Sequence, residues 1–219
     1  HHEGGLKARL RDHILAQFAA LRYLLDDNAD VQGELEKNQV PQEVRQWARE
    51  VAQNPDTLKL LIRWILLHDV GKATTTAVKE DHISYRSWGH EQRSYEVLPG
   101  SASPLLKLSV KNHLTAFNLK QAEQFAALAA EYAHESITGD AFVKAMEFVA
   151  VTTTIDLMSS QLDDNGNYGN METVAKPMIV ALEQYISTGA RMANLRTEAR
   201  LQLLEKSDWY SEYDLEDLK

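Results

Sequence analysis

The sequence contains no cysteine, so any metal must be bound through nitrogen and oxygen atoms, and no disulfide bond can form. Its longest apolar run, residues 60–67, is interrupted by Arg63 and is far too short to span a bilayer. The first residues also lack the pattern of a signal peptide. These absences predict a cytoplasmic protein without a membrane partner.

Positive charge is also scarce, because 23 Lys and Arg stand against 32 Asp and Glu, and the formal net charge is -9. This balance argues against an extensive nucleic-acid surface but leaves room for a local basic pocket. Hydrophobic residues make up 44% of the 219, enough to form one substantial core. We therefore expect a single helical domain over 6–205, with its core at about 8–160 and a C-terminal helical extension over 171–205, flanked by an affinity-tag remnant at 1–5 and an acidic tail at 206–219.

Apolar residues recur at three- and four-residue intervals along most of the chain, which predicts an all-α fold. A hairpin or extended segment near 74–86 is the one exception, and 28–40 is expected to be a loop. The helix capped by Asp56 is almost entirely apolar and is expected to lie at the centre of the bundle. Helices are expected over 6–27, from Pro41, from Asp56 to Asp69, and over 89–98, 103–114, 120–133, 140–162 and 171–205.

The segment His68-Asp69-Val70-Gly71-Lys72 ends this apolar helix. Imidazole and carboxylate groups together suit divalent ions, and burying them is costly unless they are paired or coordinated. Gly71 stands where a left-handed helix cap is expected, which puts His68 and Asp69 in the final turn. Because neighbours on a regular helix point about 100° apart, their convergence on one ion needs this irregular ending.

Four further side chains on expected helices could join the doublet. His13 lies at the edge of the apolar face of its helix. Asp156 follows Val149 by seven residues and therefore lies near the same face, where a carboxylate needs a partner. The remaining two are His90 and His113.

The order of a histidine, a His-Asp doublet and a distant aspartate resembles the HD superfamily of metal-dependent phosphohydrolases, and the resemblance covers about residues 8–160. The stretch LLHDVGK followed by Gly89-His90-Glu91 is similar to the HD domains attached to bacterial tRNA nucleotidyltransferases. Ala73 stands where that group commonly has proline, and the nucleotidyltransferase head is absent, so polymerising activity is not expected. The chain also lacks the Gly-Tyr-Pro triplet of cyclic-di-GMP phosphodiesterases and the Glu-Asp of guanosine-tetraphosphate hydrolases.

The resemblance implies an enzyme in which a metal-bound hydroxide attacks a phosphomonoester or phosphodiester, on a nucleotide or an RNA end. Homo-oligomerisation stays open. One or two divalent ions are expected, and manganese, iron, nickel, cobalt, magnesium and zinc cannot be distinguished. Asp69 would bridge two ions roughly 3.5 to 4 Å apart. The implied metal ligands are His13, His68, Asp69, His90, His113 and Asp156, and the implied catalytic residues are Asp69, Lys72 and Arg93.

The same residues have ordinary structural explanations. His13 could be hydrogen-bonded at the edge of the core, and the two later histidines could simply lie at helix ends. Asp156 could pair with a basic residue, while Lys72 and Arg93 could be solvated surface cations. A second class of function therefore stays open, namely a non-catalytic nucleotide-binding or regulatory HD module with a structural metal.

Overall fold

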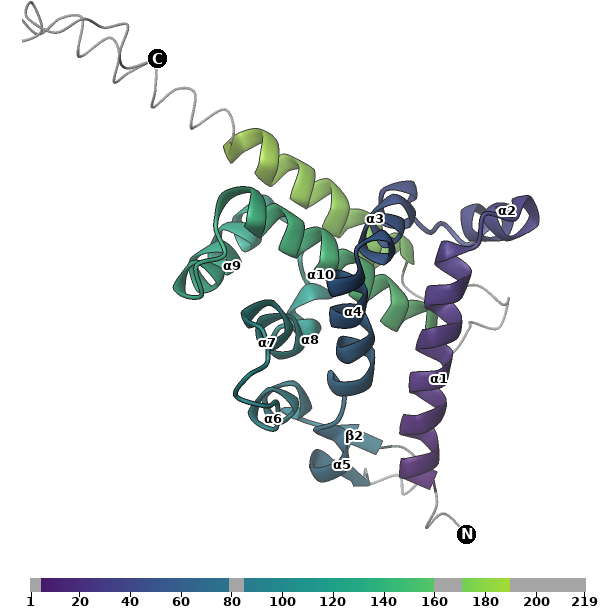
Figure 1. Cartoon of the computed structure of the whole chain (residues 1–219), viewed down its shortest axis with the longest axis vertical. Coiled ribbons are helices and arrows are strands. Elements are labelled where there is room, and N and C mark those ends of the chain that lie inside the picture. The colour runs from purple at the N-terminus through teal and green to yellow at the C-terminus, as the bar shows by residue number, and fades with distance from the viewer. Residues whose placement is uncertain (1–4, 79–84, 160–170, 190–219) are drawn as a thin grey trace, which may run out of the picture.

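The computed structural model describes residues 5–78, 85–159 and 171–189, and the structural statements below concern these residues. Within them the fold is all-α with one pair of short strands, as the apolar periodicity predicts (Figure 1). The expected acidic tail, the expected extension beyond residue 189 and all but the last residue of the expected tag remnant lie outside the described residues. No helix of the described part is long and apolar enough to cross a membrane.

The elements follow one another as helices, with the two strands after the fifth. β1 (Thr76–Val78) and β2 (Tyr85–Ser87) pair antiparallel where a hairpin or extended segment is expected, with Thr76 opposite Ser87. Residues 176–189 form a last helix after the π-helical segment η1 (Met171–Ala175). The remaining elements are α1 (Gly5–Leu25), α2 (Ala29–Lys37), α3 (Gln42–Gln53), α4 (Pro55–Leu67), α5 (Lys72–Thr75), α6 (His90–Glu96), α7 (Pro104–Lys111), α8 (His113–Ala116), α9 (Ala122–His134) and α10 (Gly139–Ser159).

The central helix is α10, and not α4 as the apolar run predicts. α1, α3, α4 and α8 pack around α10 (Figure 1). Its middle is buried on every side, including the polar residues Thr152, Thr153 and Thr154. α4 buries only one stripe, and Leu66 is 46% exposed. A run of apolar residues therefore overstated the burial of α4, because several of them face outward.

The prediction of a loop over 28–40 is wrong, because α2 occupies most of this segment. The Asn28 side chain accepts a hydrogen bond from the backbone N–H of Asp30 at 2.9 Å and so caps the helix. Leu35 is fully buried and attaches α2 to the core. One buried side chain on a polar nine-residue helix leaves too weak an apolar pattern to predict it.

Two other helix boundaries differ from expectation in ways that matter for the site. α4 begins at Pro55, with Asn54 rather than Asp56 accepting from the first free N–H groups, so its cap lies two residues earlier than expected. The single helix expected over 103–114 is broken at Asn112, whose φ of -100° and ψ of 10° separate α7 from α8. His113 consequently becomes the first residue of a new short helix.

Candidate metal centre

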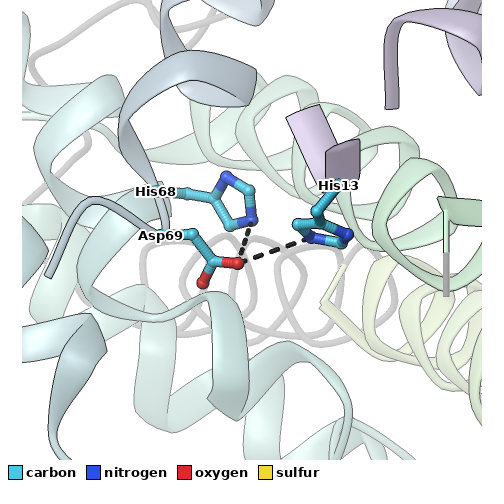
Figure 2. Close-up of side chains that lie close together, drawn as sticks. All are labelled: His13, His68 and Asp69. Carbon is cyan, nitrogen blue, oxygen red and sulfur yellow. Dashed lines mark ion pairs between the residues drawn. The ribbon is translucent and has the colours of Figure 1, made fainter. Parts of the chain in front are cut away.

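Five separate elements bring all six expected metal ligands to one place. α1 carries His13, the turn after α4 carries His68 and Asp69, and α10 carries the last acid. α6 and α8 each present a histidine as their first residue. Figure 2 shows the Asp69 carboxylate pointing toward the rings of His13 and His68. The cluster thus joins residues that are far apart in sequence.

The two oxygens of Asp69 face two different pairs of histidines. Its Oδ2 atom lies 3.4 Å from His13 Nε2 and 3.5 Å from His68 Nε2. Its Oδ1 atom lies 3.1 Å from His90 Nε2 and 3.7 Å from His113 Nε2. Each pair, with Asp69, places its ligand atoms within 4.8 Å of one another. One carboxylate is therefore shared by two groups of potential metal ligands, which we name the first group and the second group.

Asp156 completes the first group. Its Oδ1 atom lies 3.0 Å from His13 Nε2 and 3.8 Å from His68 Nε2. Burial would raise the pKa of this carboxyl, but the protonated forms of His13 and His68, through hydrogen bonds and positive charge, hold it well below its usual value. The same balance applies to Asp69, where His90, His68 and Lys72 lower the pKa against burial. Both acids are therefore carboxylates, the form that binds metal.

All four histidines turn the Nε2 atom toward the cluster, because the other ring nitrogen is anchored elsewhere. His13 Nδ1 lies 3.3 Å from Ser159 Oγ, and that hydroxyl donates its own proton to the Asp156 carbonyl oxygen at 2.8 Å, so it accepts from the ring. A carbonyl oxygen can only accept, so Nδ1 must be the donor in the other three rings. These contacts are His68 Nδ1 with Trp64 O at 3.2 Å, His90 Nδ1 with Ser87 O at 2.7 Å, and His113 Nδ1 with Val110 O at 2.7 Å.

This anchoring leaves an unprotonated Nε2 lone pair on each neutral ring, the tautomer that metal sites commonly use. In the second group, His90 Nε2 and His113 Nε2 are only 3.1 Å apart, so two lone pairs face each other. Two neighbouring ligands about 2.0–2.1 Å from one ion have a similar separation. The donor set of imidazoles and carboxylates, without sulfur, therefore fits a borderline divalent ion.

Gly71 is required for close packing and not for the left-handed cap that the sequence predicts. Its φ of -61° is right-handed, and it precedes α5. A Cβ atom at this position would overlap the carbonyl oxygen of His90 and lie 2.7 Å from Ser94 N. Gly71 N also donates to Ser94 Oγ at 2.9 Å. This close approach fixes the start of α6 against the turn that carries Asp69.

The two expected phosphate-binding cations have different surroundings. Lys72 Nζ lies 2.5 Å from Asp69 Oδ2, and the Lys72 side chain is 35% exposed. Arg93 Nη1 instead lies 3.1 Å from Glu96 Oε2 on the surface of α6. The structure thus brings Lys72 to the cluster and pairs Arg93 with a neighbour on its own helix, so a phosphate contact by Arg93 stays a prediction.

Two residues at the centre are absent from the sequence-based set. Gln17 is fully buried, and its amide nitrogen contacts ligands of the first group. Trp64 stacks on His68 with ring centroids 4.0 Å apart and an angle of 9° between the planes. Each lies four residues from a ligand on the same helix, His13 or His68, and this spacing is the signal that could have found them.

The residues of the cluster differ in exposure. His68 is fully buried and Asp69 is 3% exposed, whereas His13 is 21% exposed and Asp156 15%. The Lys72 side chain, which contacts Asp69, is 35% exposed. Among the described residues, His13, Asp156 and Lys72 are therefore the partly accessible members of the site.

No family model, curated protein or solved structure matches this chain. The six residues form a largely buried His–Asp cluster, built from five elements, whose two groups of nitrogen and oxygen donors could hold metal ions.

Proposed function

We propose that the protein is a metal-dependent phosphohydrolase of the HD type, acting on a phosphomonoester or phosphodiester of a nucleotide or an RNA end. The observation that carries the proposal is the position of Asp69, whose two oxygens face two histidine pairs. Divalent ions held there would lower the pKa of a coordinated water and neutralise charge on a phosphate. The motif order in the sequence supports the choice of phosphate esters.

The protein's own residues would arrange the reaction in three ways. The backbone contacts of His68, His90 and His113 fix each ring so that its Nε2 atom faces the cluster before any ion binds. The Asp69 carboxylate joins the two groups and sets their distance. Lys72 lies beside that carboxylate, and its exposed ammonium can move to a phosphate oxygen and stabilise the charge that develops there.

A non-catalytic module with a structural metal is the second candidate. Structural metal sites are usually closed by protein ligands, whereas catalytic sites keep an accessible position. The partial exposure of His13 and Lys72 favours the catalytic candidate. The two candidates differ in one result, because only the enzyme consumes its ligand.

The test is hydrolysis by protein that has been stripped of metal and reloaded separately with manganese, iron, nickel, cobalt, magnesium or zinc. The substrates are a panel of nucleotides, measured by phosphate release, and 2′,3′-cyclic phosphates, measured by formation of the ring-opened phosphomonoester. We expect turnover with at least one ion and its loss in Asp69→Asn. Asp56→Asn is the matched control, because Asp56 is an exposed acid that pairs only with nearby Lys59 among the ion pairs of the described residues.

Inactivity with every ion would reject the hydrolase. Nucleotide binding that needs Asp69 but produces neither phosphate nor a ring-opened phosphomonoester would support the regulatory module instead. Equal activity of Asp69→Asn and the control would show that turnover does not come from this cluster.

A further inference from the structure

Gln17 lies at the point where the ligands of the first group converge. It is one helical turn after His13 on α1, and its side chain is 0% exposed. Its Nε2 atom lies 3.2 Å from His13 Nε2, 3.3 Å from His68 Nε2 and 3.0 Å from Asp156 Oδ1. These three atoms come from α1, the end of α4 and α10. The carboxamide of Gln17 therefore stands among the atoms that would bind an ion.

The donors and acceptors of the Gln17 carboxamide do not match those that surround it. A carboxamide nitrogen has two hydrogens, but Gln17 Nε2 faces three acceptors. Its Oε1 atom is buried and has no hydrogen-bond partner among the described residues. An unpartnered buried carbonyl oxygen is unfavourable. One end of the Gln17 side chain thus has too many partners and the other has none.

A divalent ion in the first group would remove the excess of acceptors and give Oε1 a partner. The ion would bind the lone pairs of His13, His68 and Asp156. The two amide hydrogens of Gln17 can form hydrogen bonds with only some of these lone pairs. The terminal torsion of glutamine is broad and roughly two-fold, so the carboxamide can exchange its oxygen and nitrogen without moving the rest of the side chain. The oxygen would then face the cation, and oxygen donors suit hard divalent ions.

We infer that Gln17 is a further metal ligand of the first group, which binds the ion through Oε1 and holds the other ligands together through Nε2 when no ion is present. This inference rests on the metal centre of the proposed function but not on the reaction. Without an ion, Gln17 keeps His13, His68 and Asp156 close together. With an ion, it adds a neutral oxygen to the two histidine nitrogens and the carboxylate oxygens of Asp69 and Asp156.

The inference is tested by titrating the metal-depleted full chain with manganese by calorimetry and with cobalt by visible absorption. Gln17→Met keeps the size of the side chain and removes both the oxygen and the hydrogens. We expect manganese affinity at the first group to fall by about tenfold or more, and the cobalt absorption bands to change, because one ligand is lost. Gln46→Met is the matched control, since Gln46 is an exposed glutamine on α3 that contacts Glu50.

A second variant separates a ligand from a residue that only supports the fold. Gln17→Glu has nearly the same shape but brings a negative charge to within reach of Asp156. We expect the metal-free protein to melt at a lower temperature than the wild type, and manganese to bind at least as tightly. A purely structural role would instead lower the melting temperature without maintaining affinity.

The outcomes separate this inference from the proposed function. Wild-type manganese affinity and an unchanged cobalt spectrum in Gln17→Met would overturn the inference and leave the metal centre intact. Weaker manganese binding by Gln17→Glu would also overturn the inference. This second variant keeps the inference testable even if Gln17→Met does not fold. If the wild type itself binds neither ion, the metal centre is rejected and the inference falls with it.

Discussion

His90 and His113 face each other with Nε2 atoms 3.1 Å apart, while the Nδ1 atom of each ring is hydrogen-bonded to a backbone carbonyl. In the neutral state neither Nε2 carries a proton, so two lone pairs meet in a buried place. Asp69 Oδ1 lies 3.1 Å and 3.7 Å from the two nitrogens. When both rings are neutral, three acceptors therefore meet without a donor, a position that a cation can fill.

Removal of one histidine from the second group should remove one ion and leave the other. We expect the wild type to bind two manganese ions and His113→Gln to bind one, because the first group keeps all of its ligands. Metal analysis after equilibrium dialysis measures this directly. His134→Gln, a substitution at an exposed position near the end of α9, should still bind two. Two ions in His113→Gln would contradict the assignment of the second group.

Gly71→Ala should destabilise the protein by about 2 kcal/mol or more, because the new Cβ overlaps the backbone at the start of α6. The same displacement should weaken metal binding at the second group by moving His90 away from Asp69. Denaturant unfolding and manganese titration measure the two effects.

Gly33→Ala is the matched control for this substitution. Gly33 lies inside α2 with open space around its Cβ position, so alanine there should raise the free energy of unfolding by about 0.5–1 kcal/mol. If both glycine variants behave alike, close packing at Gly71 is not what requires glycine.

Acidification should destabilise the metal-free protein through His113. Burial and the nearby charge of His68 lower the pKa of His113 from 6.5 to about 4, although Val110 and Asp69 oppose the shift. In the unfolded chain His113 therefore binds a proton below about pH 6.5, whereas in the folded protein it stays neutral until about pH 4. Stability from this group is complete above 6.5 and falls as the pH drops to 4, by up to about 3 kcal/mol.

The pKa of His90 is raised, mainly by its hydrogen bond with Asp69 against the effect of burial. The pH dependence of stability from His90 therefore has the opposite sign to that from His113 and offsets part of the loss of stability. The free energy of unfolding of metal-free wild type and His113→Gln, measured from pH 7 to pH 4, separates the two residues. We expect a steeper decline in the wild type. Parallel curves would show that His113 is not held neutral.

Lys72→Met should lower kcat/KM for phosphate release by about a hundredfold or more and leave two ions bound. Lys72 contacts Asp69 but offers no lone pair to a metal while it is charged, so its loss affects the phosphate and not the ligand set. Lys59→Met, at an exposed lysine that pairs with Asp56, is the control. A fall in ion content in Lys72→Met would mean that the ammonium supports the centre and not the substrate.

The sequence predicted most of the helices and the six residues that the fold brings together, because apolar periodicity and motif order are local or sequential signals. The position of α10 at the centre was not predictable, since an apolar run does not tell which of its faces will be covered. The sequence also predicted the wrong reason for a glycine at position 71, namely a left-handed helix cap. Its requirement comes from contact with His90 and Ser94, and a close approach between distant segments leaves no local trace.

Gln17 shows the same limit within the site. Its spacing from His13 is compatible with a metal centre, but glutamine is common on helices and carries no motif. Its role becomes visible only when α1 packs against α4 and α10, so that His68 and Asp156 reach its amide. Arg93 is the reverse case, because a motif-adjacent cation turned out to pair with Glu96 on the surface.

The most direct test of the metal centre is anomalous X-ray diffraction from crystals of the full chain grown with excess manganese. Two anomalous peaks are expected on either side of the Asp69 carboxylate, one bound by His13, His68 and Asp156 and the other by His90 and His113. A map with fully ordered side chains and no peak at Asp69 would contradict the account.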